Sequence, residues 1–589
     1  MSGRAAPGSL SDGLVLGLIA AVGAVGAVVW AWGGLAGVMF GHGWPSVPAG
    51  QLLLVALRLP ARLTDPALAW PRSARRLLPD SAGCYLALGL LGTSIGTAGL
   101  AVTRSRLWPV LVGAGRPGAR WAGRGDLRRL RSPGRRRSQS RTGRLTLGRH
   151  RGRLLHAEER HALVAFGPPQ SGKSAGLAVP ALLEWAGPVV ASSIKTDLLA
   201  ATIDYRRSLG PVFVFDPFEL AQRPTHTWSP LAGCATWDGA LEAAWRLAGT
   251  AELDSKGVEG GDFWAVAAEQ RLAPLLFIAA RAGLGMDAIV RWIYGQGSRE
   301  LDQTIALLTG EAGTDEEAED VHAAYDALRA FEAQADRTRT SIEATAQGLL
   351  RAYRFRRVVR SAASSQITAE ALLDERATLY LIGDAKASKL LRPIFLALLT
   401  EVIDRAYERA TLAGGRLADP LLLCLDEAGN VAPLPNLAEI ASTAPSHNIQ
   451  LISIFHDLAQ ARSRYGRQAE TVINSHRARM LLPGVADLDT LRYFADLVGE
   501  EEAHDTARTT GAGSGGGTRT RSTRRRPLVA AESLRQLPDR HALLLYGRLP
   551  PAEVQLRMWF TDRRLRRLAT SPPGGNTGDQ QWPDHAGPE

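Results

Sequence analysis

An eight-residue run, Gly167-Pro-Pro-Gln-Ser-Gly172-Lys173-Ser174, fits the pattern G-x-x-x-x-G-K-S at all of its fixed positions. The mostly apolar segment His161–Phe166 predicts a buried strand before the run, and Ala175–Trp185 predicts a helix after it. A strand, a loop and a helix in this order place backbone N–H groups and a helix N-terminus around a phosphate group. A glycine-rich surface turn, the alternative, does not explain this context. The run therefore predicts a phosphate-binding loop.

The loop residues have expected roles toward ATP and Mg²⁺. Lys173 is expected to neutralise charge on the β- and γ-phosphates, and the Ser174 hydroxyl to coordinate Mg²⁺. The nucleotide-binding set predicted in this way is Gly167, Pro168, Pro169, Gln170, Ser171, Gly172, Lys173, Ser174 and Ala175.

A second motif ends in two acids. Leu421–Leu425 is an uninterrupted apolar run, which is typical of a central strand in a parallel sheet, and Asp426 and Glu427 follow it directly. Ligands of such sheets bind at the carboxyl ends of strands. We therefore expect Asp426 to hold Mg²⁺ through water, and Glu427 to act in catalysis by polarising the attacking water. Together with Lys173, these residues predict ATP hydrolysis.

Further apolar runs alternate with helical spacing, which predicts an α/β fold. The core is expected to be the parallel sheet of a RecA-like P-loop NTPase, with additional strands at 189–194, 212–215, 378–382 and 449–455. Lys195 and Asp197 follow one of these strands and Asp216 follows another, where a site role and a turn or capping role are equally open. From 236 to 355 strand patterns give way to helical ones, which predicts an inserted all-α domain.

The composition of the chain divides it into segments. The acidic stretch Glu311–Asp320 is expected to be a solvated loop. The predicted organisation is a membrane region (1–103), an arginine-rich juxtamembrane segment (104–153), a first nucleotide-binding part (154–235), the all-α insertion (236–355), a second nucleotide-binding part (356–569) with a flexible Gly-, Thr- and Arg-rich loop (503–527), and a disordered tail (570–589).

Two uncharged runs precede the phosphate loop. Gly13–Phe40 has 28 residues without a charge and Ser81–Thr103 is a second such run, whereas about 20 apolar residues span a bilayer. They predict a two-helix transmembrane hairpin, at about 13–40 and 81–103; buried core helices are the alternative. The three cysteines of the chain are far apart and have no metal-type spacing.

The charge of the chain is concentrated after the second run. The net charge is +11, and residues 104–153 contain 16 arginines against one acid, Asp126. Positive charge is retained on the cytoplasmic side of a membrane, so both termini are expected in the cytoplasm and the protein in the cell membrane. The arginines are expected to contact anionic inner-membrane lipids, with DNA phosphates as the alternative.

Several passages resemble the coupling proteins of type IV secretion, the TraG/TraD-like conjugative DNA-transfer ATPases. The resemblance extends over about 85–562. It is carried by TGRLTLGRHRGRLL (142–155), ASSIKTDLL (191–199), FVFDPFE (213–219), WSPL (228–231), DFWAVAAEQRLAPLL (262–276) and LCLDEAGNVAPLPNL (423–437).

The resemblance implies a membrane-anchored, ATP-driven DNA translocase. Its implied partners are DNA with bound relaxase and the type IV secretion machinery, and its implied assembly is a homohexamer around a DNA channel. In such a ring an arginine of a neighbouring subunit is expected to complete the site, with Arg477 and Arg479 as candidates.

The chain departs from this family at one position. The family commonly has Gln after the strand beyond the acidic motif, whereas IQLISIFHDLAQ (449–460) has His456 there. A neutral imidazole can also donate a hydrogen bond, so we predict that His456 contacts the γ-phosphate or the attacking water and senses hydrolysis. The alternative is a capping or surface histidine beside Asp457.

Two other functions fit parts of the sequence. An FtsK/HerA-like pump for double-stranded DNA would share the motor, but its usual C-terminal winged domain is not apparent. A membrane scaffold that binds ATP without hydrolysing it would share the loop, but it would have no need of Glu427.

Overall fold

The computed structural model describes residues 9–104, 118–131, 143–254, 261–311, 314–509 and 518–570. The chain divides into two compact units, Met1–Pro117 and Gly118–Glu589. The predicted disordered tail lies outside the described residues, apart from Thr570 at the end of the last helix.

The first unit contains the two uncharged runs as helices. They are α1 (Ser9–Phe40) and α4 (Ser81–Arg104), and the Trp32 indole N–H donates to the Cys84 carbonyl at 2.7 Å between them. Residues 41–80 pack against both helices and include α2 (Ala49–Arg58). The stretch Ala21–Phe40 of α1 has a mean hydropathy of 1.7, and its length and composition suffice to cross a membrane.

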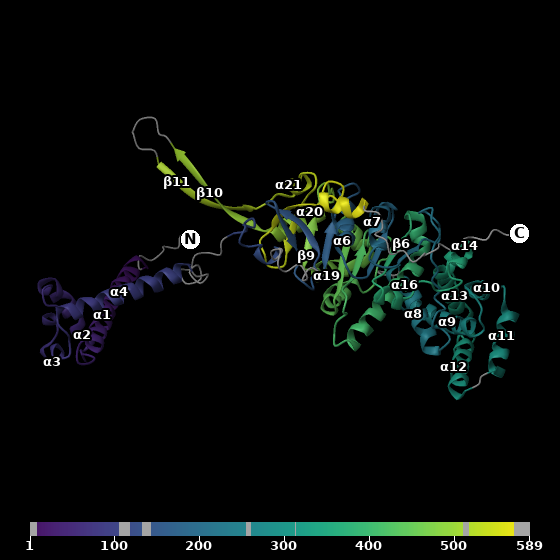
Figure 1. Cartoon of the computed structure of the whole chain (residues 1–589), viewed down its shortest axis with the longest axis horizontal. Helices are drawn as coiled ribbons and strands as arrows, with labels where there is room; N and C mark the ends of the chain where they lie inside the picture. Colours follow the sequence, from purple (N-terminus) through teal and green to yellow (C-terminus); the bar gives the residue numbers. More distant parts are fainter. Residues whose placement is uncertain are drawn as a thin grey trace, which may run out of the picture. The chain divides into compact units, whose positions relative to one another are not determined.

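The second unit is built on a mixed sheet (Figure 1). Among the described residues, eleven strands have the order β2-β1-β13-β12-β9-β3-β8-β7-β4-β6-β5. The strands from β9 to β5 in this order are mutually parallel. Their bounds are β3 (Leu163–Phe166), β4 (Val189–Ser193), β5 (Val212–Phe215), β6 (Thr378–Ile382), β7 (Leu421–Leu425), β8 (Ile449–Phe455) and β9 (Ala478–Leu481).

An antiparallel extension continues the sheet beyond β9, and sequence patterns missed it. It consists of β1 (Thr146–His150), β2 (Arg153–His156), β12 (His541–Tyr546) and β13 (Ala552–Gln555). The expected boundary at residue 153 is therefore wrong, because β1 and β2 belong to the sheet. Leu147 and Leu155 are fully buried in its core despite the surrounding arginines.

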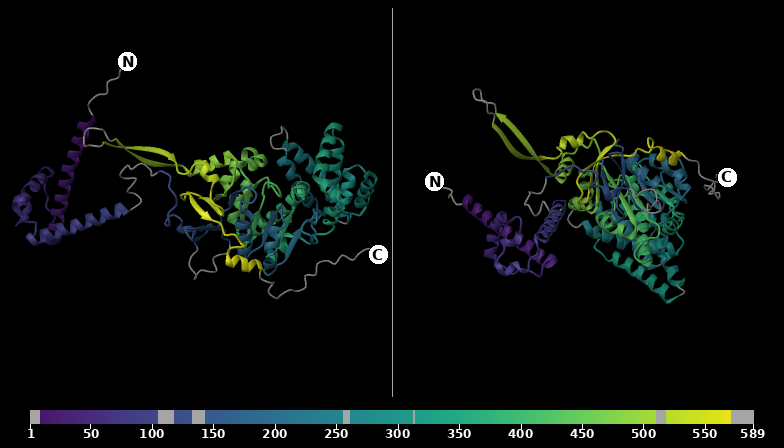
Figure 2. Two further views of the ribbon diagram at one scale, coloured as in Figure 1. Left: turned by 90° about the horizontal axis from the view of Figure 1, so that it is seen from above. Right: turned by 60° about the vertical axis from the view of Figure 1, so that its left-hand side comes forward.

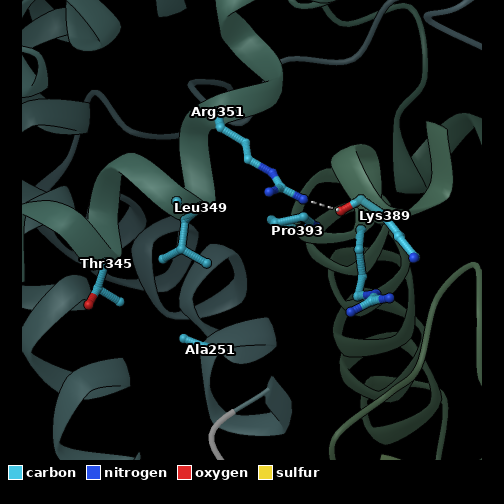
Figure 3. A pocket seen from close by; sticks show the side chains of 8 residues that line it. Ala251, Thr345, Leu349, Arg351, Lys389 and Pro393 are labelled. Atoms are coloured by element: carbon cyan, nitrogen blue, oxygen red, sulfur yellow. Dashed lines mark hydrogen bonds between the residues drawn. The ribbon is translucent and has the colours of Figure 1, made fainter. Parts of the chain in front are cut away.

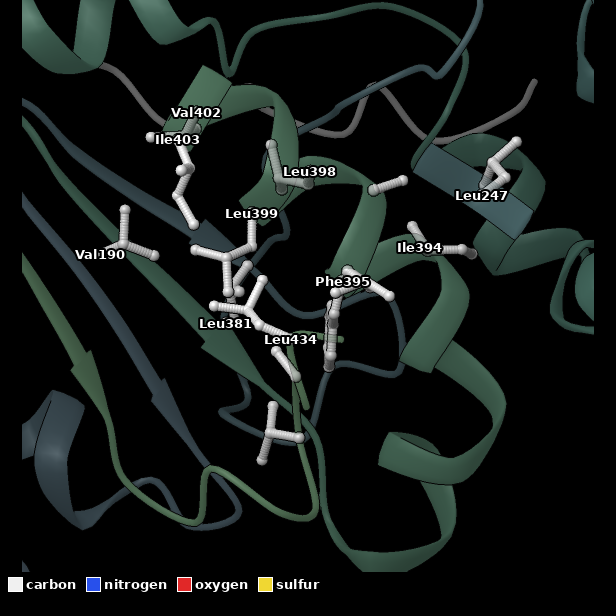
Figure 4. Packing of buried hydrophobic residues seen from close by; sticks show 14 of the residues in the cluster. Val190, Leu247, Leu381, Ile394, Phe395, Leu398, Leu399, Val402, Ile403 and Leu434 are labelled. Carbon is white, nitrogen blue, oxygen red and sulfur yellow. The ribbon is translucent and has the colours of Figure 1, made fainter. Parts of the chain in front are cut away.

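Helices cover both faces of the sheet, as expected for a doubly wound core. Successive residues of β3 alternate between two apolar clusters, with Val164 in one and Leu163 in the other. One face packs against α6 (Val179–Glu184) and α7 (Asp197–Arg207), and the other against α16 (Ala385–Leu412). Figure 4 shows Leu399 of α16 beside Leu381 of β6, in the cluster that also contains Val164.

The described residues between β5 and β6 form helices and loops only. The helices are α8 (Trp237–Asp254), α9 (Gly261–Arg281), α10 (Met286–Ile293), α11 (Ser298–Glu311), α12 (Asp315–Glu332), α13 (Asp336–Leu350), α14 (Arg356–Arg360) and α15 (Ala369–Asp374). The stretch Phe263–Arg281 of α9 is also long and apolar enough for a membrane span, but it is mostly buried among its neighbours.

The acidic stretch 311–320 is not a continuous solvated loop, as its pattern had suggested. Helix α12 begins within it, and the Thr314 hydroxyl accepts the Glu317 amide at 3.1 Å as an N-cap. Asp315, Glu316 and Glu317 form the first turn, where carboxylates interact favourably with the helix dipole.

The expected loop at 503–527 forms two strands in its described part, whereas its flexibility stays a prediction. Strands β10 (Glu500–Thr509) and β11 (Thr518–Pro527) pair in continuous antiparallel register and extend away from the main sheet (Figure 2). Threonine favours β structure, and here it alternates with arginine. Cross-strand ion pairs such as Arg526–Glu501, at 2.7 Å, offset the positive charge at the base of this hairpin.

Candidate nucleotide-binding and hydrolysis site

The phosphate loop joins β3 to a helix, as predicted. Residues Gln170 and Gly172 have positive φ angles of 66° and 86°, which turn the loop back on itself. A π-helical turn, η5 (Ser174–Ala178), follows and leads into α6. The loop thus occupies the carboxyl edge of the parallel strands, where successive backbone N–H groups can surround an anion.

Both acids after β7 contact the loop. Ser174 donates its hydroxyl to Asp426 at 2.5 Å, and Lys173 Nζ lies 2.5 Å from Glu427 Oε1. All three charged residues of this group are buried, and Glu427 has a φ of 68°, a conformation that a non-glycine residue rarely adopts. Strained backbone of this kind concentrates at functional sites.

His456 completes a triangle with Lys173 and Glu427. Its Nδ1 atom is 3.0 Å from Lys173 Nζ, and its Nε2 atom is 2.8 Å from Glu427 Oε2. Because the lysine can only donate, the hydrogen-bond network places the imidazole proton on Nε2, which donates to the carboxylate. The capping role belongs to Asp457, whose carboxylate accepts the Gln460 amide at the start of α18 (Leu458–Tyr465).

Strand order explains this meeting of residues that are far apart in sequence. β8 lies between β3 and β7, and all three strands run in parallel. The residue that follows β8 must therefore lie between the phosphate loop and the acidic pair.

The local environment shifts the pKa values of Asp426 and Glu427 in opposite directions. Burial raises the pKa of Asp426 to about 6, although the hydrogen bond from Ser174 and the charge of Lys173 oppose the rise. Burial acts in the same direction on Glu427, but the hydrogen bonds from His456 and Lys173 outweigh it and lower its pKa to about 2. Glu427 is therefore ionised at neutral pH, and Asp426 would gain most from a cation.

The residues present fit a hydrated Mg²⁺. The Oδ1 atom of Asp426 is buried and has no hydrogen-bond partner among the described residues, while Oδ2 is held by Ser174. Oxygen donors of this kind are those that Mg²⁺ prefers.

Sequence reasoning missed two polar residues around the triangle. Asn430 donates to Glu427 Oε2 at 3.0 Å, and Gln460 accepts the His456 amide at 2.7 Å. Asn430 lies three residues after Glu427 in a turn, and Gln460 lies four residues after His456 in a helix. This spacing was the signal in the sequence that could have identified them.

The other candidate residues take structural positions. Asp197 begins α7, and Lys195 lies in the loop before it. Asp216 is buried and accepts the Ala221 amide at 2.7 Å. Arg479 donates to the carbonyls of Ile473 and Asn474 of its own chain.

A separate cavity of about 240 Å³ lies between the helical insertion and α16 and contains none of these residues (Figure 3). It is lined by Arg351, Lys389 and Arg392 together with smaller uncharged residues, and Arg351 donates to the Lys389 carbonyl at 3.3 Å. The site defined above is therefore the loop and the acidic pair, and not this cavity.

This fold and this site define a P-loop NTPase of the RecA-like class. The family model described as "Type IV secretory system Conjugative DNA transfer" matches residues 120–577. The chain belongs to this family.

Individual relatives agree with the family. The conjugal transfer protein TraG of Escherichia coli is 24% identical over 417 residues, which cover 65% of this chain and 63% of TraG. Protein VirD4 of Rhizobium rhizogenes is 23% identical over 421 residues, which cover 70% of this chain and 60% of VirD4. The chain thus spans less than two thirds of the length of these relatives.

Solved structures share the fold. The unbound conjugative coupling protein TrwB has a TM-score of 0.55 and 17% identity, with 76% of this chain and 95% of that chain covered. TrwB in complex with the ATP analogue ADPNP has a TM-score of 0.53 and 16% identity, with 76% and 96% covered.

Proposed function

We propose that this protein is a membrane-anchored ATPase that acts as the coupling protein of a conjugative type IV secretion system. The contact of Lys173 and Ser174 with the acids Glu427 and Asp426, at one sheet edge, supports hydrolysis. Membership of the conjugative DNA-transfer family supports DNA as the substrate. A relaxase bound to this DNA is implied by the family resemblance alone. The relative TrwB has been solved with ADPNP and with ADP and Mg²⁺, which supports ATP and Mg²⁺ as ligands here.

In this proposal the chain's own residues exchange partners when ATP binds. Lys173 leaves Glu427 for the phosphates, because two or three phosphate charges attract it more strongly than one carboxylate does. Glu427 then becomes free to orient and polarise the attacking water, while His456 still holds its second oxygen. Bound Mg²⁺, held by Ser174 and by Asp426 through water, would stabilise the charge that develops during phosphoryl transfer.

The proposal is tested by ATP turnover of the full-length protein in detergent, with and without DNA and with and without Mg²⁺. We expect turnover that requires Mg²⁺ and rises when DNA is added. Co-purification with a relaxase would then favour secretion over a pump without a secretion partner. Binding of ATP with no turnover under any of these conditions would contradict the proposal and favour a scaffold.

His456 is proposed to report the state of the γ-phosphate to β8. A glutamine at this position can accept from Lys173 through its carbonyl and donate to Glu427 through its amide, whereas alanine can do neither. We therefore expect His456→Gln to keep DNA-stimulated turnover and His456→Ala to fall to the basal rate while still binding nucleotide. The measurement is turnover with and without DNA, and near-parental stimulation in both variants would disprove the sensor role.

The remaining parts of the proposal follow the family resemblance. We infer a cell-membrane location with α1 and α4 as a hairpin and both termini in the cytoplasm, supported by the apolar length of α1 and the arginines that follow α4. A homohexamer with an arginine supplied in trans is part of the same inference. Arg477 and Arg479 are weak candidates, because they lie at the start of β9, toward the sheet edge opposite the loop.

A further inference from the structure

A segment near the end of the chain lies directly on the phosphate loop. β13 pairs antiparallel with β12, and β12 pairs antiparallel with β9, so β13 runs in the same direction as β3. The residues that follow β13, Leu556–Phe560, therefore emerge at the same sheet edge as the loop. They emerge on the flank opposite to Glu427 and His456, because β9, β12 and β13 lie on the other side of β3 from β8 and β7.

The backbone of the loop helix provides a hydrogen-bond acceptor for this segment. In the π-helical turn η5 the Val179 N–H donates to the Ser174 carbonyl, five residues earlier. If this pattern continued, the N–H of residue 180 would donate to the Ala175 carbonyl. Residue 180 is a proline and has no N–H. The Ala175 carbonyl instead accepts the Trp559 N–H at 3.1 Å.

Two glycines of the loop region provide the space. A Cβ atom at Gly172 would overlap Met558 Cε, and one at Gly176 would lie 3.1 Å from Leu556 Cβ. Any side chain at Gly172 would therefore have to move the Met558 side chain, which now packs on the loop. The buried Arg557 fixes the segment further, since it bonds Glu184 of α6 at 2.7 Å and Asp562 at 3.0 Å.

The position of the segment matches the nucleoside end of a bound nucleotide. The lysine of such a loop is expected to contact the β- and γ-phosphates. Because Glu427 and His456 contact Lys173, their flank of the loop would hold the γ-phosphate. The nucleoside, bonded to the α-phosphate, must leave the loop away from them, over the start of the helix at Ala175. Phe560 directly follows Trp559, whose N–H bonds Ala175, and it has 44% of its surface exposed. The ring of Trp559 packs against it with centroids 6.0 Å apart.

We propose that Phe560, supported by Trp559, is the platform on which the base of the nucleotide stacks. This inference rests on the proposed nucleotide-binding function and adds the nucleoside subsite to it. Trp559 holds the position through its backbone and its partly buried ring, and Phe560 offers the exposed ring. Every base presents a π face to an aromatic ring, so stacking favours nucleotides over inorganic phosphates without choosing between adenine and guanine.

The test compares ligands that have and lack a base. For the full-length protein in detergent, dissociation constants for ATP, GTP and inorganic tripolyphosphate are measured by competition against a fluorescent nucleotide. Loss of one stacked base typically costs about a factor of ten in affinity. We expect Phe560→Ala to weaken ATP and GTP binding by about tenfold each and to leave tripolyphosphate unchanged, and Phe560→Tyr to bind like the parent.

A matched control is Phe263→Ala, which removes an exposed phenylalanine from α9, far from the loop in sequence. It should change none of the three constants. Unchanged ATP affinity in Phe560→Ala would overturn the platform. Equal weakening of ATP and tripolyphosphate would overturn it as well, because the segment would then only shape the loop. Failure of the parent protein to bind any of the three ligands would instead contradict the proposed function.

Discussion

Replacement of Glu427 by glutamine should lower the rate of ATP turnover by about three orders of magnitude without weakening ATP binding. The glutamine keeps the size and one hydrogen-bonding oxygen of the side chain but cannot polarise water as a carboxylate does, and a positioned base of this kind contributes roughly 10² to 10⁴ in rate. Binding should be as tight or tighter, because Lys173 no longer has a buried carboxylate at 2.5 Å competing with the phosphates. Single-turnover hydrolysis and a separate binding measurement distinguish the two effects.

The control for this substitution is Glu439→Gln. It makes the same chemical change at an exposed position of α17 (Leu437–Thr443), a short distance along the chain. Its turnover should match that of the parent. Turnover in Glu427→Gln within tenfold of the parent would show that another group activates the water.

Replacement of Lys173 by alanine should weaken ATP binding by about a hundredfold and also destabilise the nucleotide-free protein. The first effect follows from the loss of a charge-assisted contact to the phosphates. The second follows because Glu427 Oε1 loses its partner in a buried site, and an unpaired buried group costs about 1–3 kcal/mol. His456 and Asn430 still bond the other oxygen, so the site should remain folded.

A double-mutant comparison separates these two effects. Lys173→Ala combined with Glu427→Gln removes the unpaired charge, so thermal stability should return toward that of the parent while ATP binding stays weak. Lys386→Ala, at an exposed position in the first turn of α16, is the matched control and should change neither property. A Lys173→Ala variant with parental ATP affinity would show that the loop does not bind phosphate through this residue.

Local patterns predicted the central strands of this protein closely. The runs at 212–215, 378–382 and 449–455 match β5, β6 and β8, because buried parallel strands are continuous apolar segments bounded by turns. The antiparallel strands β1 and β2 escaped notice because arginines and glycines interrupt them. Their burial depends on pairing with β13, which lies about 400 residues later in the chain.

The β10–β11 hairpin was missed for a related reason. Glycine-, threonine- and arginine-rich composition is typical of flexible segments, and it contains no apolar alternation to indicate a buried face. The ladder of backbone hydrogen bonds and the cross-strand pairing of Glu501 and Arg526 oppose that tendency, and both depend on register.

By itself the sequence predicted the chemistry that we propose for this protein, through Lys173 and Ser174 in one short motif and Asp426 and Glu427 in another. These roles follow from residue type and local spacing, which a sequence displays directly. Only the tertiary structure decided which side chains surround them. The insertion of β8 between β3 and β7 brings His456 to Lys173 and Glu427, and the antiparallel extension brings Phe560 to the opposite flank of the loop. Strand order is set by pairing between distant segments, and no local pattern encodes it.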